Sequence, residues 1–221
     1  MNSHCRFALY GCIVDHKKSK EVIDVAHEQG LLGMTVLLGR GTVTKGVLGF
    51  LGLSDQERDV ILFACDVSHG DQAMEVIAQE LDFRKPKKGI LFSIPLPKIL
   101  GASLYCDVLQ FKEDDYLVEH QAIYVIVEKG KAEDVIDAAT KAGARGGTIL
   151  NARGSGIHEQ EMLFNIPIEP EKEMVLIIAK VEQVPAITQQ IQTDLQLDEP
   201  GNGILFLLDV RKAIGLYGEE A

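Results

Sequence analysis

The chain has no tryptophan, no surplus of basic residues and no apolar run long enough to cross a membrane. Its net charge of −11 disfavours non-specific nucleic-acid binding, because phosphate backbones are held mainly by surplus Lys and Arg. The N-terminus lacks the basic stretch, apolar run and small-residue cleavage site of an export signal. We therefore expect a cytoplasmic protein whose partners are small molecules or other proteins.

Signatures of metal sites and enzymes are also missing. Six scattered histidines lack H-x-H and H-x-x-x-H spacing: His4, His16, His27, His69, His120 and His158. Four cysteines lack C-x-x-C spacing, which favours reduced thiols over a disulfide or a zinc site: Cys5, Cys12, Cys65 and Cys106. No Walker A or G-x-S-x-G motif occurs, and a solvated loop explains the acidic residues beside His158. We predict no metal site and no enzyme.

An internal repeat dominates what is present. The segment EVIDVAHEQGLLGMTVLLGRG (21–41) matches DVIDAATKAGARGGTILNARG (134–154) at an offset of 113 residues. After one inserted residue the offset becomes 114, and Pro86, Gly89 and Phe92 then match Pro200, Gly203 and Phe206. The repeat predicts two domains, residues 1–101 and 121–221, joined by a linker at 102–120.

Both repeats alternate strand and helix periodicity in the same order. We predict strands at 7–14, 34–38, 60–65 and 90–94, matched by 122–127, 148–152, 174–180 and 204–210. The first helix of each repeat should end at Gly30 or Gly143, and Asp71 is the expected N-cap of the second helix in repeat one. Long loops are expected at 39–58 and 153–171. The order β-α-β-β-α-β predicts an α+β protein made of two tandem ferredoxin-like units.

The segment GLLGMTV (30–36) resembles the corresponding segment of the PII family of nitrogen-regulatory signalling proteins, and GARGGTI (143–149) is a looser version. The order of parts is also similar throughout both repeats. The resemblance identifies the T-loop bases as GRGTVTKG (39–46) and ARGSGIHE (152–159). It identifies the B-loops as FRKPKKGILF (83–92) and LDEPGNGILF (197–206), and the C-terminal segment as VRKAIGLYGEE (210–220).

The resemblance implies adenine-nucleotide binding in clefts between neighbouring units, and Thr35 and Thr148 correspond to a family residue near the adenine. Glycine backbone N–H groups with nearby Lys or Arg can cradle phosphate independently of the family. The first predicted cradle comprises Arg40, Gly41, Lys45, Gly46, Lys87, Lys88 and Gly89. The second comprises Arg153, Gly154, Gly156, Gly201, Gly203, Arg211 and Lys212. Isolated glycine-rich turns, by contrast, often serve only to reverse the chain.

The two copies depart from the family in their ligand loops. The T-loop glutamine that binds Mg²⁺ in 2-oxoglutarate sensors is replaced by Thr44 and His158, so we do not expect ordinary 2-oxoglutarate sensing. The first B-loop is basic with one glycine, whereas the second has two glycines but carries Asp198 and Glu199. An apolar run at 47–53 predicts either a protein contact or packing within an oligomer.

Three functions from different classes remain at this point. The first is a PII-like regulator that binds ATP, ADP or AMP, with Mg²⁺, and signals to a protein partner. The second is a trimeric metal-binding protein of the CutA type, and the third is a duplicate that only assembles. If three units form a closed ring, the simplest homo-oligomer contains three duplicated chains, whose six units form two rings. A monomer is the alternative.

Overall fold

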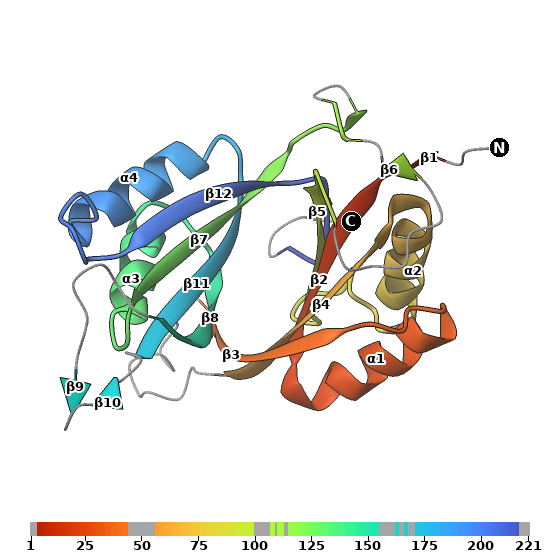
Figure 1. Ribbon diagram of the computed structural model, residues 1–221, viewed down its shortest axis with the longest axis horizontal. Coiled ribbons are helices and arrows are strands. Elements are labelled where there is room, and N and C mark those ends of the chain that lie inside the picture. The colour runs from red at the N-terminus through yellow and green to blue at the C-terminus, as the bar shows by residue number, and fades with distance from the viewer. Residues whose placement is uncertain are drawn as a thin grey trace. The chain divides into compact units, whose positions relative to one another are not determined.

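The computed structural model describes residues 4–43, 56–99, 107–108, 110–112, 115–154, 162–163, 166–167 and 171–216. The chain forms two compact units, and each unit takes segments from both sequence repeats (Figure 1). Unit 1 consists of Met1–Leu37, Arg58–His120 and Asp209–Ala221, and unit 2 consists of Leu38–Glu57 and Gln121–Leu208. The predicted boundaries at 101 and 121 refer to the sequence repeats and remain a prediction.

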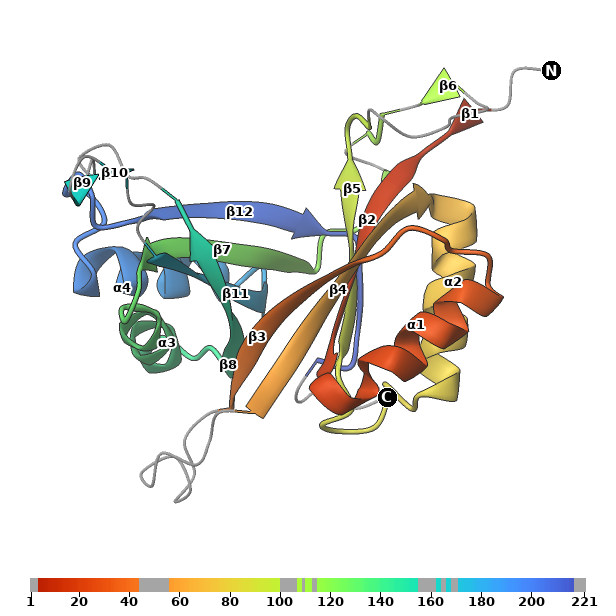
Figure 2. The same ribbon diagram turned by 60° about the horizontal axis from the view of Figure 1, so that its bottom comes forward.

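Unit 1 holds the elements of the first repeat. They are β2 (Phe7–Asp15), η1 (His16–Lys18), α1 (Ser19–Glu28), the start of β3 (Thr35–Val43), most of β4 (Gln56–Asp66), α2 (Val67–Glu80) and β5 (Ile90–Leu96). The strands lie in the order β5-β2-β4-β3, and both helices cover the same face (Figure 2). A small parallel pair, β1 (His4–Cys5) with β6 (Asp107–Val108), is added beside them.

Unit 2 repeats this arrangement. Its elements are β7 (His120–Glu128), α3 (Ala132–Lys141), β8 (Gly146–Arg153), β11 (Glu171–Lys180), α4 (Val184–Asp194) and β12 (Ile204–Val210). The order β12-β7-β11-β8 is the same as in unit 1, and β9 (Met162–Leu163) pairs with β10 (Ile166–Pro167) separately. The predicted α+β fold of two β-α-β-β-α-β units is therefore confirmed.

Each unit is completed by a strand segment from the other repeat. The second half of β3 belongs to unit 2, where it pairs antiparallel with β8 from Gly39 opposite Leu150 to Val43 opposite Gly146. The strand β13 (Lys212–Ile214) belongs to unit 1, where it pairs antiparallel with β5. These additions explain why compact units and sequence repeats have different boundaries.

The helix ends follow the sequence prediction. Gly30 has φ +80° and Gly143 has φ +96°, conformations that glycine adopts without a Cβ penalty. The N–H of Leu31 donates to the carbonyl of Ala26, and the N–H of Ala144 donates to Ala139 in the same way. Each pattern is a Schellman motif, so both first helices end at the predicted glycines.

The prediction for the start of α2 was wrong. Asp66 is the N-cap, and its side chain accepts a hydrogen bond from the N–H of Ser68 at 3.0 Å. Asp71 lies inside the helix instead. Because Asp66 follows β4 directly, the helix begins one turn earlier than the apolar spacing indicated.

The core of each unit lies between its helices and one face of its strands. In unit 1 the alternate residues Tyr10, Cys12 and Val14 of β2 pack against α1 and α2. In unit 2 the alternate residues Ile123, Val125 and Val127 of β7 pack against α3 and α4. This two-residue alternation is the pattern expected for a strand that faces helices on one side.

Two further observations change the sequence-based interpretation. The strand β3 continues to Val43 and β4 begins at Gln56, so the first long loop is shorter than predicted. Cys5 is in a disulfide, so the prediction of reduced thiols was wrong for this residue. Cys12 and Cys65 are free, as predicted.

The segment 102–120 belongs to unit 1. In its described part Asp115 forms an ion pair with Arg6 at 3.0 Å, and the Arg6 guanidinium lies 5.8 Å from the ring centre of Phe111. This segment therefore does more than connect the repeats, because its side chains hold the N-terminal end of β2 in place.

Candidate functional site

The described part of the predicted first T-loop base, residues 39–43, belongs to unit 2. Arg40 forms ion pairs with Glu133 at 2.8 Å and Glu173 at 3.3 Å. Glu173 is 6% exposed and accepts the N–H groups of Gly130 and Ala132 at the start of α3. Arg40 thus neutralises a buried carboxylate that caps a helix, which gives this arginine a structural role.

The first predicted cradle is divided between the two units. Arg40 and Gly41 belong to unit 2, whereas the basic turn with Lys87, Lys88 and Gly89 belongs to unit 1. Lys87 has φ +64°, and Gly89 has φ +145° with its ideal Cβ position only 2.5 Å from the carbonyl oxygen of Ile13. The conformation of this turn therefore requires Gly89. Lys45 and Gly46 lie outside the described residues.

The second predicted cradle is divided as well, but its larger part lies in one unit. Arg153, Gly154, Gly201 and Gly203 all belong to unit 2. Gly201 has φ +98° and Gly203 has φ +142°, which matches Gly89 in the first repeat. A Cβ on Gly154 would meet nothing within 4 Å among the described residues, so packing against that part of the chain does not require glycine there. Gly156 lies outside the described residues.

The arginine and lysine of the C-terminal segment lie in unit 1, against helix α2. The guanidinium of Arg211 donates two hydrogen bonds to the carboxylate of Asp71, one from Nη1 at 3.0 Å and one from Nη2, and its Nη2 lies 3.4 Å from the hydroxyl of Tyr10. The Arg211 side chain is 12% exposed. Burial, with a hydrogen bond to Asp71, raises the pKa of Tyr10 above its usual value, so this tyrosine stays protonated. Tyr10, Asp71 and Arg211 form what we call the β13 lock.

A second ion pair joins the same strand and helix. The Lys212 Nζ lies 2.8 Å from the Glu75 carboxylate, which also accepts from Arg84 at 2.5 Å. The hydrogen bond from Lys212 and then that from Arg84 lower the pKa of Glu75. Asp71 and Glu75 stand one turn apart on α2, so both hold β13 from the same helix face.

The two threonines that were predicted to lie near the adenine have different surroundings. Thr35 is exposed at the start of β3, in unit 1. Thr148 is 5% exposed in unit 2, where it lies between Gly41 of β3 and Leu176 of β11. The second threonine is therefore buried, while the first is exposed.

A groove of about 810 Å³ lies between α3 and α4 in unit 2. Its walls carry four carboxylates and two lysines: Glu128, Asp134, Asp137 and Asp194 with Lys131 and Lys141. Lys141 is already paired with Asp194 at 2.8 Å. This acidic lining disfavours the binding of a phosphate group in the groove.

Sequence reasoning missed the buried carboxylates beside the first helices. Asp59 is 3% exposed and accepts a hydrogen bond from the hydroxyl of Ser19, and the His16 Nδ1 lies 2.9 Å from it. Glu173 stands at the matching position of the second repeat. The offset of 114 residues aligns Asp59 with Glu173. This match between the two repeats is the sequence signal that could have revealed the two carboxylates.

The parts of the chain that the structure describes contain no cluster of three or more His, Cys, Asp or Glu side chains arranged to hold a metal ion. No helix within those described ranges is long and apolar enough to span a membrane. The glutamine-replacing positions Thr44 and His158 and the apolar run 47–53 lie outside them. Loop-borne ligand contacts therefore stay predictions.

Residues 120–220 match the family model of nitrogen regulatory protein P-II. The second repeat is therefore similar to the P-II family. The P-II match includes the Gly201–Gly203 turn, Arg153, Gly154 and the β13 segment. Residues 1–119, with the first cradle, lie outside it.

Solved P-II structures are also similar to this chain. Arabidopsis thaliana PII bound to citrate is 25% identical, with 41% of this chain and 77% of that chain covered and a TM-score of 0.34. The GlnK–ATP complex of B. subtilis is 18% identical, with 44% and 83% covered and a TM-score of 0.33. Among curated proteins there is no significant match.

Proposed function

We propose that the protein is a P-II-like regulator, without enzymatic activity, that binds an adenine nucleotide and controls a protein partner through its long loops. The proposal includes a cytoplasmic location, a homo-oligomer and a role in nitrogen or related metabolism. The observation that carries it is the P-II match over the complete second repeat, with both glycine-rich ligand loops inside it.

We place the more favourable nucleotide site in unit 2. Four predicted contact residues, Arg153, Gly154, Gly201 and Gly203, share this unit, and Arg153 is exposed beside β11. The open space around Gly154 lets a phosphate approach the backbone closely. In the first cradle, by contrast, Arg40 is already held by two carboxylates.

Arg211 and Lys212 contribute less to this site than the sequence indicated. Both cations are neutralised by Asp71 and Glu75 in unit 1. A phosphate would have to replace those carboxylates before it could bind them. The proposed site therefore depends on Arg153 for its positive charge.

Calorimetric titration with ATP, ADP and AMP, with and without Mg²⁺, tests the proposal. We expect a dissociation constant below about 1 mM for at least one nucleotide, and no binding below that concentration would overturn the function. Arg153→Ala should weaken binding about tenfold, because it removes a charge-assisted phosphate contact.

Two variants make the titration specific. Gly154→Ala should leave the unfolding midpoint unchanged, because its Cβ meets open space, but should reduce nucleotide affinity. Lys180→Ala removes a positive charge at the other end of β11 and serves as the matched control, with affinity unchanged. Equal losses for Arg153→Ala and Lys180→Ala would mean that the effect is only general charge.

The absence of the T-loop glutamine gives a further expectation about the effector. Adding 2-oxoglutarate should not tighten Mg²⁺-ATP binding, because Thr44 and His158 replace the metal-binding glutamine of the family. Tighter binding would show that another residue supplies the ligand. The alternative of a CutA-type metal-binding protein has no support from the described residues, which contain no cluster of three or more His, Cys, Asp or Glu side chains that could hold a metal ion.

A further inference from the structure

In unit 1 the edge of β5 is occupied by a strand from the end of the chain. β13 pairs with it antiparallel, with Lys212 opposite Ser93, Ala213 opposite Phe92 and Ile214 opposite Leu91. The N–H of Arg211 donates to the carbonyl of Ser93 at 2.8 Å as this pairing begins. The added strand satisfies backbone groups that an open edge would expose.

In unit 2 the matching edge belongs to β12. The sequences Gly89–Phe92 and Gly203–Phe206 are the same four residues, GILF, so β5 and β12 are equivalent strands. Within the described ranges β12 ends the strand order and no strand pairs with its outer edge. Figure 1 shows β12 with β7 on one side.

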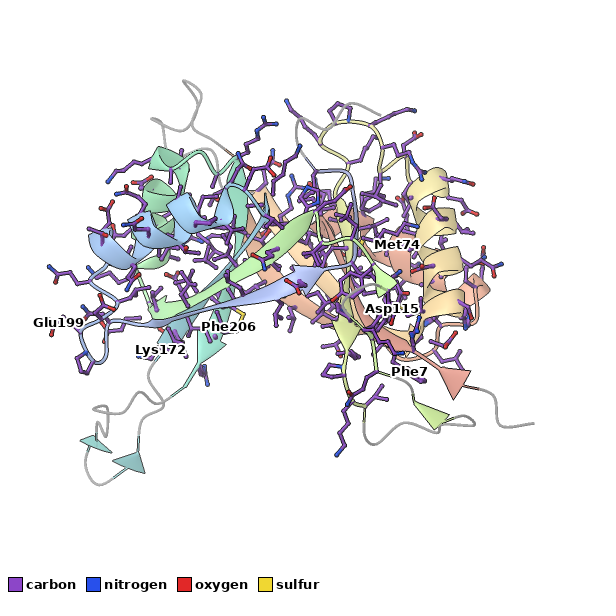
Figure 3. All side chains as sticks on the ribbon, turned by 90° about the horizontal axis from the view of Figure 1, so that it is seen from above. Phe7, Met74, Asp115, Lys172, Glu199 and Phe206 are labelled. Atoms are coloured by element: carbon purple, nitrogen blue, oxygen red, sulfur yellow. The ribbon has the colours of Figure 1, made fainter. Side chains whose placement is uncertain are left out.

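The side chains of β12 differ from those of β5 in exposure. Phe92 and Ile94 are 0% and 4% exposed, whereas their counterparts Phe206 and Leu208 are 37% and 38% exposed. Ile204, before them, is 56% exposed. Figure 3 shows Phe206 on the side of the strands away from α4. An apolar, unpaired strand of this kind is a template for the addition of another strand.

The sequence contains a segment that corresponds to β13. At the offset of 114 residues, KAIG (212–215) matches KILG (98–101). Lys98 and Ile99 follow β5 and lie outside any strand, with Lys98 exposed and Ile99 half-buried. Leu100 and Gly101 lie outside the described residues. Repeat one therefore carries its own copy of the strand that completes unit 1.

The residues of the β13 lock change together in the other repeat. Tyr10, Asp71 and Arg211 correspond to Ile123, Pro185 and Pro97 at the same offsets. A polar, partly buried triad is thus replaced at all three positions by apolar side chains. Pro97 and Pro185 are exposed in the single chain. Such a combined replacement fits two surfaces that pack on each other without charges, because an unpaired charge would be costly to bury.

We propose that the outer edge of β12 is a docking site for a second copy of the chain, which adds its Lys98–Ile99 segment as an antiparallel strand. The register of β13 on β5 places Ile99 opposite Phe206 and Lys98 opposite Leu207. The segment of the same chain is not paired with β12, so another copy supplies it. Because donor and acceptor surfaces differ, the contact is head-to-tail, the type of contact from which closed rings or open filaments are built.

This inference deepens the homo-oligomer of the proposed function, and the two can fail separately. Light scattering measures the mass of the wild-type protein, and a mass of 24.2 kDa at all concentrations would overturn both. A larger mass retained by Ile99→Asp would overturn only the docking site. We expect Ile99→Asp to shift the mass to that of the single chain or to weaken association at least tenfold. Leu117→Asp, at a residue 76% exposed in unit 1, is the control that should leave the mass unchanged.

A cross-link tests the register directly. Ile99→Cys and Phe206→Cys are purified separately, mixed and oxidised, and we expect a disulfide between two different chains. The native Cys12 is buried, and burial raises the pKa of Cys65 to about 12, so neither thiol should compete. Leu32→Cys, at a residue 86% exposed, replaces Ile99→Cys in the control mixture and should give no disulfide with Phe206→Cys.

The double variant Ile99→Cys/Phe206→Cys distinguishes the remaining arrangement. A disulfide formed within one chain, at single-chain mass, would place the segment on its own unit 2 and overturn the proposal. Circular dichroism of every variant checks that the fold is intact. Ile99 lies outside the strands of unit 1, so its substitution should not disturb that core.

Discussion

The strands β5 and β12 begin with the same residues and have different surroundings. In unit 1 the ring of Phe92 covers Gly11 of the neighbouring strand, where a Cβ would lie 2.1 Å from the ring. In unit 2 the counterpart of Gly11 is Tyr124, and the rings of Tyr124 and Phe206 stack with centres 5.3 Å apart. Phe92 is fully buried, while Phe206 remains more than a third exposed. Identical sequence thus leads to a core residue in one unit and a surface residue in the other.

The strand β13 accounts for the rest of the difference between the surroundings of β5 and β12. β5 carries β13 and its lock of Tyr10, Asp71 and Arg211, whereas no described strand covers the outer edge of β12. One repeat can thus keep the fold of the other and still present a different edge, because a few residues at equivalent positions differ. Three tests of unequal expected effect show how far the two edges differ.

The largest expected effect is that of Phe92→Ala compared with Phe206→Ala. Phe92→Ala should cost about 3–5 kcal/mol of unfolding free energy, because it leaves a cavity over Gly11 in a fully buried site. Phe206→Ala should cost about 1 kcal/mol, chiefly through the lost ring stacking with Tyr124. Urea unfolding of the two variants measures both values. Equal losses would contradict the proposed difference between the edges.

The second test removes the lock from the occupied edge. Asp71→Ala leaves the guanidinium of Arg211, which is 12% exposed, without its carboxylate partner, and should cost about 2–3 kcal/mol. Pro185→Ala, at the matching position, should cost less than about 1 kcal/mol, because Pro185 is exposed. Amide hydrogen exchange at residues 212–214 distinguishes release of β13 from general destabilisation. If those amides stay as protected as in wild type, the lock does not hold the strand.

The smallest effect concerns the ion pair of Lys212 and Glu75. Because Lys212 lowers the pKa of Glu75, ionised Glu75 stabilises the folded state above its ordinary pKa. That contribution is lost as the pH falls through the lowered pKa, so acid should release β13 before the core unfolds. Glu75→Gln should remove this pH dependence and weaken β13 slightly, since Glu75 is about a third exposed. Hydrogen exchange of residues 212–214 between pH 3 and pH 6 measures it, and an unchanged profile in Glu75→Gln would contradict the assignment.

Much of the fold was predictable because it depends on local chemistry. The helix ends at Gly30 and Gly143 need left-handed backbone that glycine supplies, and both were predicted. The strand and helix order followed from apolar periodicity in two copies. Asp71 was wrongly predicted as a cap because its residue type suits a cap, whereas Asp66 satisfies the first N–H groups of α2 one turn earlier.

The candidate site was less predictable, because its residues come from segments that are distant in sequence. Arg40 and Arg211 are of the right type for phosphate, but the fold places Glu173 and Asp71 against them. Cys5 could not be recognised as disulfide-bonded, since cysteine spacing does not reveal which residues approach each other. Arg153, by contrast, is exposed, and the acid opposite it on β11, Glu171, is exposed as well.

The sequence by itself determined the duplication, the order of helices and strands in each repeat and the turns that need glycine, because these features depend on residues close along the chain. Only the tertiary structure decided which unit each segment completes. β13 leaves its own repeat to pair with β5, and the end of β3 leaves its repeat to pair with β8. Strand pairing uses backbone groups that every residue carries, so its partners are set by the geometry of the folded units.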